Sequence, residues 1–134
     1  MDFADLDTAG LANEGALMPV HSPSGQPVTQ DDGSPVTLTL LGDDSDVLVK
    51  FDRITTNQHL RGGQTITAEL SEAKHINRLA RACVGWSGVI LDGKPLEHSE
   101  ENAKILFKRF RWLRQQAALF ISDRANFLKA SPQT

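Results

Sequence analysis

The sequence predicts an α+β protein: a small antiparallel sheet or pair of hairpins together with three or four helices. Three observations predict this class. Residues 36–40 alternate between apolar and polar side chains, as a half-buried strand does. Apolar residues recur every three or four positions over 67–84 and again over 99–128, as on one face of a helix. Glycines, prolines and aspartates that favour turns separate these segments.

The chain length of 134 residues fits a single domain, residues 1–134, that buries a core without a metal or disulfide. Within it, residues 1–42 predict a short helix followed by a hairpin and strand region. Residues 43–134 predict a mainly helical part with a hairpin near 86–96. The last helical region, 99–128, holds more apolar side chains than any other predicted element, and we expect it to dominate the fold.

The first predicted elements are short. Residues 4–15 predict a helix with a weak apolar face, which Gly15 would end. Residues 17–20 and 26–29 predict paired edge strands around a turn, because the proline in each removes a donor from the ladder. The alternating segment that follows is the clearest strand, with three inward-facing residues: Val36, Leu38 and Leu40.

A helix is predicted after the acidic turn 42–46, with Ser45 as its N-cap and Asp46 in its first turn. Four apolar residues fit one face of this helix: Val47, Leu48, Phe51 and Ile54. Residues 47–49 are also compatible with a strand. We expect the polar stretch 55–64, which contains two glycines, to be a loop or a frayed helix end.

Thr67 is predicted to cap a helix that ends near Val84 and Gly85. Its apolar face is formed by Leu70, Ala73, Ile76 (or Asn77), Ala80 and Cys83. Residues 86–96 predict a short extended segment in which Asp92 and Gly93 form a type I′ hairpin turn. Ser99 then caps the last helical region, and two acids follow it where the helix dipole favours negative charge.

Helical-wheel geometry leaves two large aromatic residues of the last region unexplained. One arc collects the apolar residues Ala103, Leu106, Phe110, Leu113, Ala117, Phe120 and Ile121. Phe107 borders the basic arc, and Trp112 lies well away from the apolar one. Either the helix breaks near 107–110 and changes phase, or a partner buries a second face, and the sequence leaves both alternatives open.

Charge is distributed unevenly along the chain, although the net charge is only −3. Residues 1–49 hold nine acids and no lysine or arginine, whereas residues 100–134 hold seven bases and three acids. We expect the two ends to attract each other, within a subunit or between subunits, because the acidic half would repel phosphate. The basic and aromatic stretch 108–114 keeps nucleic-acid binding as a minority interpretation.

Patterns of catalytic or ligand-binding residues are missing from the sequence. It contains no glycine-rich phosphate-binding motif of the Rossmann or P-loop type. The four histidines are scattered, and His75 and Cys83 lie two helical turns apart, too far to chelate one ion. We therefore expect no enzyme activity, no cofactor and no metal site, and we expect Cys83 to be a core residue.

The chain also lacks the patterns that direct proteins to membranes. No apolar run approaches the length of about 18 residues that a membrane span requires. The acidic start, residues 1–7, has neither the basic nor the apolar part of a secretory signal. We expect the protein to stay in the cytoplasm in which it is made, or in a particle assembled there.

Two stretches of the chain together form a familiar pattern. The first contains Gly15–Leu17, His21–Val28, Asp32–Leu38 and Leu41–Ser45. The second contains Cys83–Val89, Asp92–Leu96, Ser99–Asn102 and Leu113–Ala117, including a Gly-Trp-x-Gly followed by Ser-x-Glu-Asn. Over about residues 15–128 the chain thereby resembles the tail assembly chaperone family of long-tailed, siphovirus-like bacteriophages.

This resemblance implies a non-enzymatic chaperone of virion assembly. Members bind the long, helical tape measure protein in the host cytoplasm and help to bring tail tube subunits to it. They are not normally kept in the finished tail. In many such phages a ribosomal slip makes a second, longer product, and this chain would correspond to the shorter one.

A chaperone for helices needs exposed apolar surface flanked by charge. Our candidate partner-binding residues lie in the last helical region: Phe107, Phe110, Trp112, Lys108, Arg111 and Arg114. Trp86 is a weaker candidate. Trp86 and Phe110 also fit the core, and Phe107 and Trp112 fit either place. The alternative functions are a virion structural component, such as a minor tail or neck protein, and then a nucleic-acid-binding regulator; a homo-oligomer is compatible with all three.

Overall fold

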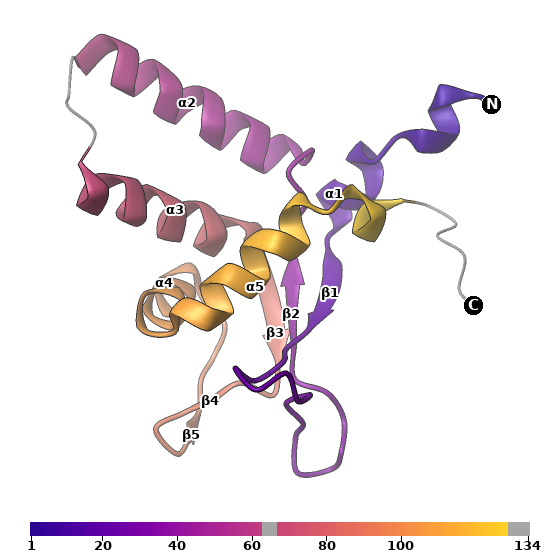
Figure 1. Cartoon of the computed structure of the whole chain (residues 1–134), viewed down its shortest axis with the longest axis vertical. Helices are drawn as coiled ribbons and strands as arrows, with labels where there is room; N and C mark the ends of the chain where they lie inside the picture. The colour runs from indigo at the N-terminus through magenta and orange to yellow at the C-terminus, as the bar shows by residue number, and fades with distance from the viewer. Residues whose placement is uncertain (63–66, 129–134) are drawn as a thin grey trace.

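The computed structural model describes residues 1–62 and 67–128, and within these ranges it confirms the α+β class. They contain five α-helices, a three-stranded antiparallel sheet and a two-stranded one. Figure 1 shows the larger sheet at the centre, with two helices, α2 and α3, projecting from it side by side. The described residues contain one helix more than the predicted upper number of four, because the last helical region is divided into two helices.

The predicted helix at 4–15 is interrupted near its middle. A 3-10 helix, Phe3–Leu6, is followed by α1 (Ala9–Glu14), and Asp7 between them is extended. The Asp7 carboxylate accepts a hydrogen bond from the backbone N–H of Ala9 at 2.9 Å, so this aspartate starts a new helix instead of continuing the first. Gly15 ends α1 as predicted, with a φ of +90° that favours glycine.

The central sheet has the order β1 (Ala16–Pro19), β2 (Thr37–Leu40), β3 (Cys83–Ser87), and all its pairs are antiparallel. Leu38 of β2 lies between Met18 of β1 and Trp86 of β3. Val36, Leu38 and Leu40 are all buried, which confirms the predicted inward face of this strand.

Three Pro-Val pairs, eight residues apart, form a closed ring of backbone hydrogen bonds beside the sheet. The N–H of Val20 donates to the carbonyl of Val36 (2.9 Å), that of Val36 to Val28 (2.9 Å), and that of Val28 to Val20 (3.0 Å). The prediction of a strand at 26–29 is therefore wrong, because no continuous strand forms there. This segment makes only isolated bridges on either side of Val28, because its backbone is shared between two neighbours.

Helices α2 (Asp46–Gly62) and α3 (Ala68–Ala82) form what we call the helical arm. Ser45 and Thr67 cap them as predicted: the Ser45 hydroxyl accepts from the N–H of Leu48 at 3.3 Å, and that of Thr67 from the N–H of Leu70 at 3.1 Å. The loop alternative for 55–64 was wrong as far as Gly62, which is helical, and residues 63–64 lie outside the described residues.

Arg78 joins the two helices of the arm at its base. Its Nε and Nη2 donate to the two carboxylate oxygens of Asp52 at 2.8 and 2.9 Å, and its Nη1 donates to Asp43 at 3.1 Å. These bonds raise the pKa of Arg78, the bond to Asp52 contributing most. A bidentate pair of this kind fixes the orientation of the two side chains as well as the distance between them. It thereby stabilises helix α2, whose full length could not be predicted because its sequence is polar.

The predicted hairpin is present as β4 (Ile90–Leu91) and β5 (Lys94–Pro95). Asp92 and Gly93 both have positive φ, +52° and +83°, as a type I′ turn requires. The preceding helix α3 ends at Ala82, so Cys83 belongs to β3 and not, as predicted, to the helix.

The last helical region consists of α4 (Glu100–Arg109), α5 (Arg111–Ser122) and a 3-10 helix, Arg124–Phe127. Ser99 caps α4 as predicted. Phe110 separates α4 from α5 with φ −113° and ψ 92°, which is extended backbone. The first of the two alternatives raised by the helical wheel is therefore the one observed: the helix breaks and its phase changes.

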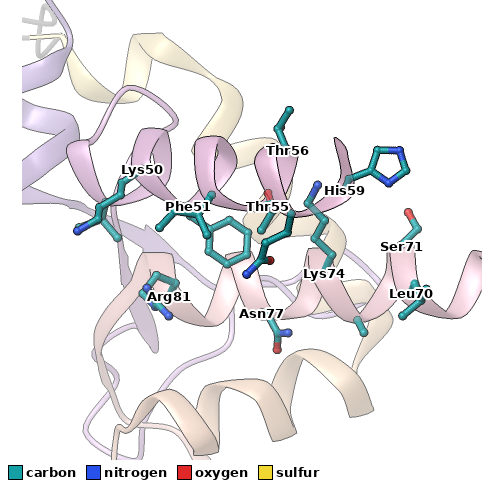
Figure 2. Close-up of a pocket in the computed structure, with 14 residues that line it drawn as sticks. Lys50, Phe51, Thr55, Thr56, His59, Leu70, Ser71, Lys74, Asn77 and Arg81 are labelled. Atoms are coloured by element: carbon teal, nitrogen blue, oxygen red, sulfur yellow. The ribbon is translucent and has the colours of Figure 1, made fainter. Parts of the chain in front are cut away.

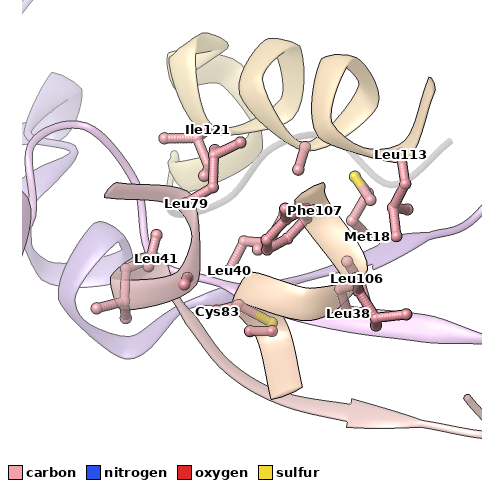
Figure 3. Packing of buried hydrophobic residues seen from close by; sticks show 14 of the residues in the cluster. Met18, Leu38, Leu40, Leu41, Leu79, Cys83, Leu106, Phe107, Leu113 and Ile121 are labelled. Carbon is pink, nitrogen blue, oxygen red and sulfur yellow. The ribbon is translucent and has the colours of Figure 1, made fainter. Parts of the chain in front are cut away.

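The core lies between the central sheet and helices α3, α4 and α5 (Figure 3). Leu38 and Leu40 of the sheet meet Leu79 of α3, Phe107 of α4 and Ile121 of α5, all of them fully buried. Cys83 is buried in this core as predicted, and burial raises the pKa of its thiol to about 12. The helical arm continues beyond this core, and it leaves part of its inner surface open.

Candidate partner-binding groove

The aromatic residues predicted to contact a partner belong largely to the core. Phe107 is only 1% exposed, so it offers no surface to a partner. Phe110 and Trp112 are half-buried against the core, with their ring centroids 5.9 Å apart. Trp86 is also half-buried, and its Nε1 donates to the carbonyl of Leu96 at 2.8 Å, which gives it a structural role.

The predicted basic candidates divide into two groups. Arg114 is 8% exposed and its Nη1 donates to a carboxylate oxygen of Glu72 on α3 at 2.8 Å. Lys108 and Arg111 are exposed, and within the described ranges neither lies within 4.0 Å of a carboxylate. Their neighbour Arg109 pairs with Asp92. The fold thus exposes Lys108 and Arg111, whereas Phe107 lies in the core and Phe110 and Trp112 are only partly exposed beside them.

A larger opening lies elsewhere, between the two helices of the arm (Figure 2). We call it the arm groove; it has a volume of about 880 Å³ and is lined by residues that include Val47, Phe51, Ile54, Leu70 and Ala73. Figure 2 shows the Phe51 ring between α2 and α3. Ile54 and Leu70 remain 45% and 51% exposed, so the groove presents apolar side chains to solvent.

The polar residues around the groove give it a positive charge. Lys50, His59, Lys74 and Arg81 line it, and no aspartate or glutamate is among the described lining residues. Arg81 pairs with Glu100 at 2.8 Å, and its guanidinium carbon lies 5.9 Å from the centroid of the Phe51 ring. Within residues 1–62 and 67–128, Lys50 and Lys74 have no carboxylate within 4.0 Å. Two lysines are therefore available to an incoming acidic group.

Sequence reasoning missed this groove, although it singled out the residues that form it. Val47, Ile54, Leu70 and Ala73 were predicted on the apolar faces of their helices, and the structure exposes all four. The available signal was that two predicted helices, consecutive in the sequence, each carry an apolar face, which can line a groove where nothing else packs against it.

Two structural features are not found among the described residues: a metal-binding cluster and a membrane-spanning helix. Among residues 1–62 and 67–128, no three His, Cys, Asp or Glu side chains are grouped so that they could hold a metal ion. Nor does any helix there combine the length and apolarity needed to cross a membrane. The chain matches no family model, no curated protein and no solved structure.

Proposed function

We propose that this protein is a non-enzymatic chaperone of phage tail assembly that holds an amphipathic helix of the tape measure protein in the arm groove. In this role it assists the assembly of the tail tube. The observation that carries the proposal is the groove itself, which combines exposed apolar side chains with two lysines, Lys50 and Lys74, that have no carboxylate partner among the described residues.

A helix docked in a groove is a recurring mode of peptide recognition. The client would insert apolar residues spaced three and four apart against Ile54 and Leu70, and each buried Å² of apolar surface contributes about 25 cal/mol. Acids that flank this apolar stripe would meet Lys50 and Lys74, which speeds encounter and selects the orientation of the client.

The residues on which the family resemblance rests support this proposal because they hold together the part of the fold from which the arm projects. Trp86 bonds to Leu96, and the side-chain amide of Asn102 donates to the carbonyl of Glu97 at 2.9 Å. Gly88 has a φ of +82°, which favours glycine. These residues organise the sheet and the start of α4, and the arm that carries the groove projects from this frame.

Co-purification of the tape measure protein of the same phage tests the proposal. We expect the wild-type protein to retain it and the double variant I54Q/L70Q to bind it at least about tenfold more weakly. L60Q is the matched control, because Leu60 is on α2 and 74% exposed but does not line the groove. Failure of the folded wild-type protein to bind, or equal binding by I54Q/L70Q, would count against the proposal.

We place this activity in the host cytoplasm during virion assembly. Quantitative mass spectrometry of purified virions would then find the chain absent or far below the copy number of tail proteins. A fixed, stoichiometric number of copies per virion would instead support the alternative, a minor tail or neck component.

A further inference from the structure

We propose that the arm groove also receives residues 1–7 of a second copy of this chain, so that the protein associates with itself when no client is bound. The inference does not depend on the identity of the client. It follows from two surfaces of opposite character that the same molecule leaves open.

The first surface is the acidic segment 1–7. Phe3 is 84% exposed and Leu6 is also exposed, although the short 3-10 helix places them among three aspartates, Asp2, Asp5 and Asp7. Among the described residues, no arginine, lysine or histidine pairs with any of these carboxylates. Exposed apolar side chains surrounded by one sign of charge indicate a contact surface.

The second surface is the arm groove, and its charge is complementary. It offers the apolar side chains of Phe51, Ile54 and Leu70, and at its rim Lys50 and Lys74 lack carboxylate partners among the described residues. Burying Phe3 and Leu6 there would remove exposed apolar surface from both partners. The aspartates would at the same time approach the two lysines, and complementary charge sets both partner choice and register.

The segment is directed away from the groove of its own chain. Thr8, which follows the segment, donates its hydroxyl hydrogen bond to Asp44. Asp44 is itself held by Arg124, whose Nε and Nη2 donate to it at 2.7 and 3.0 Å. Figure 1 shows the N-terminus on the side of the molecule opposite the outer end of the arm. A neighbouring copy is therefore the nearest source of a groove for this segment.

Charge reversal on each surface gives a direct test by sedimentation velocity at low ionic strength over a range of protein concentrations. We expect the wild-type protein to self-associate and added salt to weaken this association. The groove variant K50E/K74E and the segment variant D2K/D5K should each associate at least about tenfold more weakly, since each then opposes like charges. An equimolar mixture of the two variants should associate again, because each supplies the surface that complements the other.

The matched control is K108E/R111E, which reverses two exposed cations on α4 and α5 and should associate as the wild type does. A wild-type protein that stays monomeric, single variants that still associate, or a mixture that stays monomeric would overturn the proposal. A monomer whose residues 1–7 change their NMR shifts in K50E/K74E would show docking within one chain, which also overturns it.

A further full-length variant separates this inference from the proposed function. F3S/L6S should lose self-association while it keeps or improves capture of the tape measure protein, because it leaves the groove intact and unoccupied. Loss of self-association without any tape measure binding, even by the wild type, would contradict the proposed function alone.

Discussion

Arg114 of α5 and Glu72 of α3 form an ion pair 2.8 Å long that joins positions 42 residues apart in the sequence. The arginine is buried and the glutamate is largely exposed. The hydrogen bond from Arg114 is the main reason why the pKa of the Glu72 carboxyl lies below its ordinary value. A residue predicted to contact a client therefore fastens two helices of the same chain.

Replacing Arg114 tests this structural role. We expect R114M, which keeps an unbranched aliphatic chain, to lower the free energy of unfolding by about 1–2 kcal/mol, because a charge-assisted hydrogen bond is lost. Urea denaturation followed by circular dichroism measures the change. R111M is the control and should stay within about 0.5 kcal/mol of the wild type, since Arg111 is exposed. Equal effects of the two substitutions would contradict the assignment.

Phe107 provides a second test of the finding that residues predicted to contact a partner lie inside the protein. F107A removes a fully buried ring between the sheet and α5, and we expect it to cost about 3–5 kcal/mol of stability. L119A removes an exposed side chain from α5 and should cost far less. Thermal and urea unfolding of both variants decide the matter. A mild effect of F107A would place this ring outside the core.

The position of Phe107 also shows which features of the fold could be predicted from the sequence. The helical wheel revealed that Phe107 and Trp112 did not share the apolar arc, and a break at Phe110 is the physical reason. Helix starts were predictable from an equally local feature, because the hydroxyl groups of Ser45, Thr67 and Ser99 each accept a hydrogen bond from the backbone N–H three residues further along. Short-range geometry was therefore readable from the residues themselves.

Features that depend on distant parts of the chain were not predictable in this way. The ring formed by Val20, Val28 and Val36 requires three segments to meet, and the strand pattern within one segment does not show which other segments its backbone will join. Whether Ile54 and Leu70 are covered depends on how far α2 and α3 extend beyond the core. Local periodicity predicted their apolar faces, but it could not show that these faces would remain open as a groove.

Two glycines provide a stability test with opposite signs. A Cβ atom added at Gly42 would lie 2.9 Å from the Cβ of Ala12 and 3.0 Å from ring carbons of Phe127, so G42A should overpack this site and cost about 1–3 kcal/mol. A Cβ at Gly10 meets nothing within 4 Å, and G10A should stabilise α1 by up to about 1 kcal/mol. Urea midpoints measure both, and a tolerated G42A would show that Phe127 is not fixed there.

Asp44 should make stability depend on acid. Hydrogen bonds from Arg124 first, and then from Thr8, lower the pKa of Asp44 below its ordinary value of 3.8. A lowered pKa means that the folded state favours the carboxylate form of Asp44. The stabilisation is therefore complete above pH 3.8, and it is lost as the pH falls through the pKa that Asp44 has in the folded state. We expect D44N to be less stable by roughly 0.5–1 kcal/mol at neutral pH.

The difference between D44N and the wild type should shrink as the pH is lowered below 3.8, and urea unfolding across this range measures it. D31N is the control, because Asp31 is exposed and, within the described part of the chain, forms no ion pair. A difference that stays constant down to the lowest pH would mean that Asp44 is not held by Arg124 in solution.

Cys83 reports on opening of the core without any substitution. Its thiol is buried, and burial raises its pKa to about 12, so at pH 8 the thiol stays almost entirely protonated in the folded protein. A thiol reagent should therefore label the protein only through its unfolded population, and at a rate that rises with urea. F107A should increase that rate more than about a hundredfold, because each 1.4 kcal/mol of lost stability multiplies the unfolded population about tenfold. Labelling of the wild-type protein as fast in buffer as in urea would show that Cys83 is accessible and that the core between β3 and α4 is not closed.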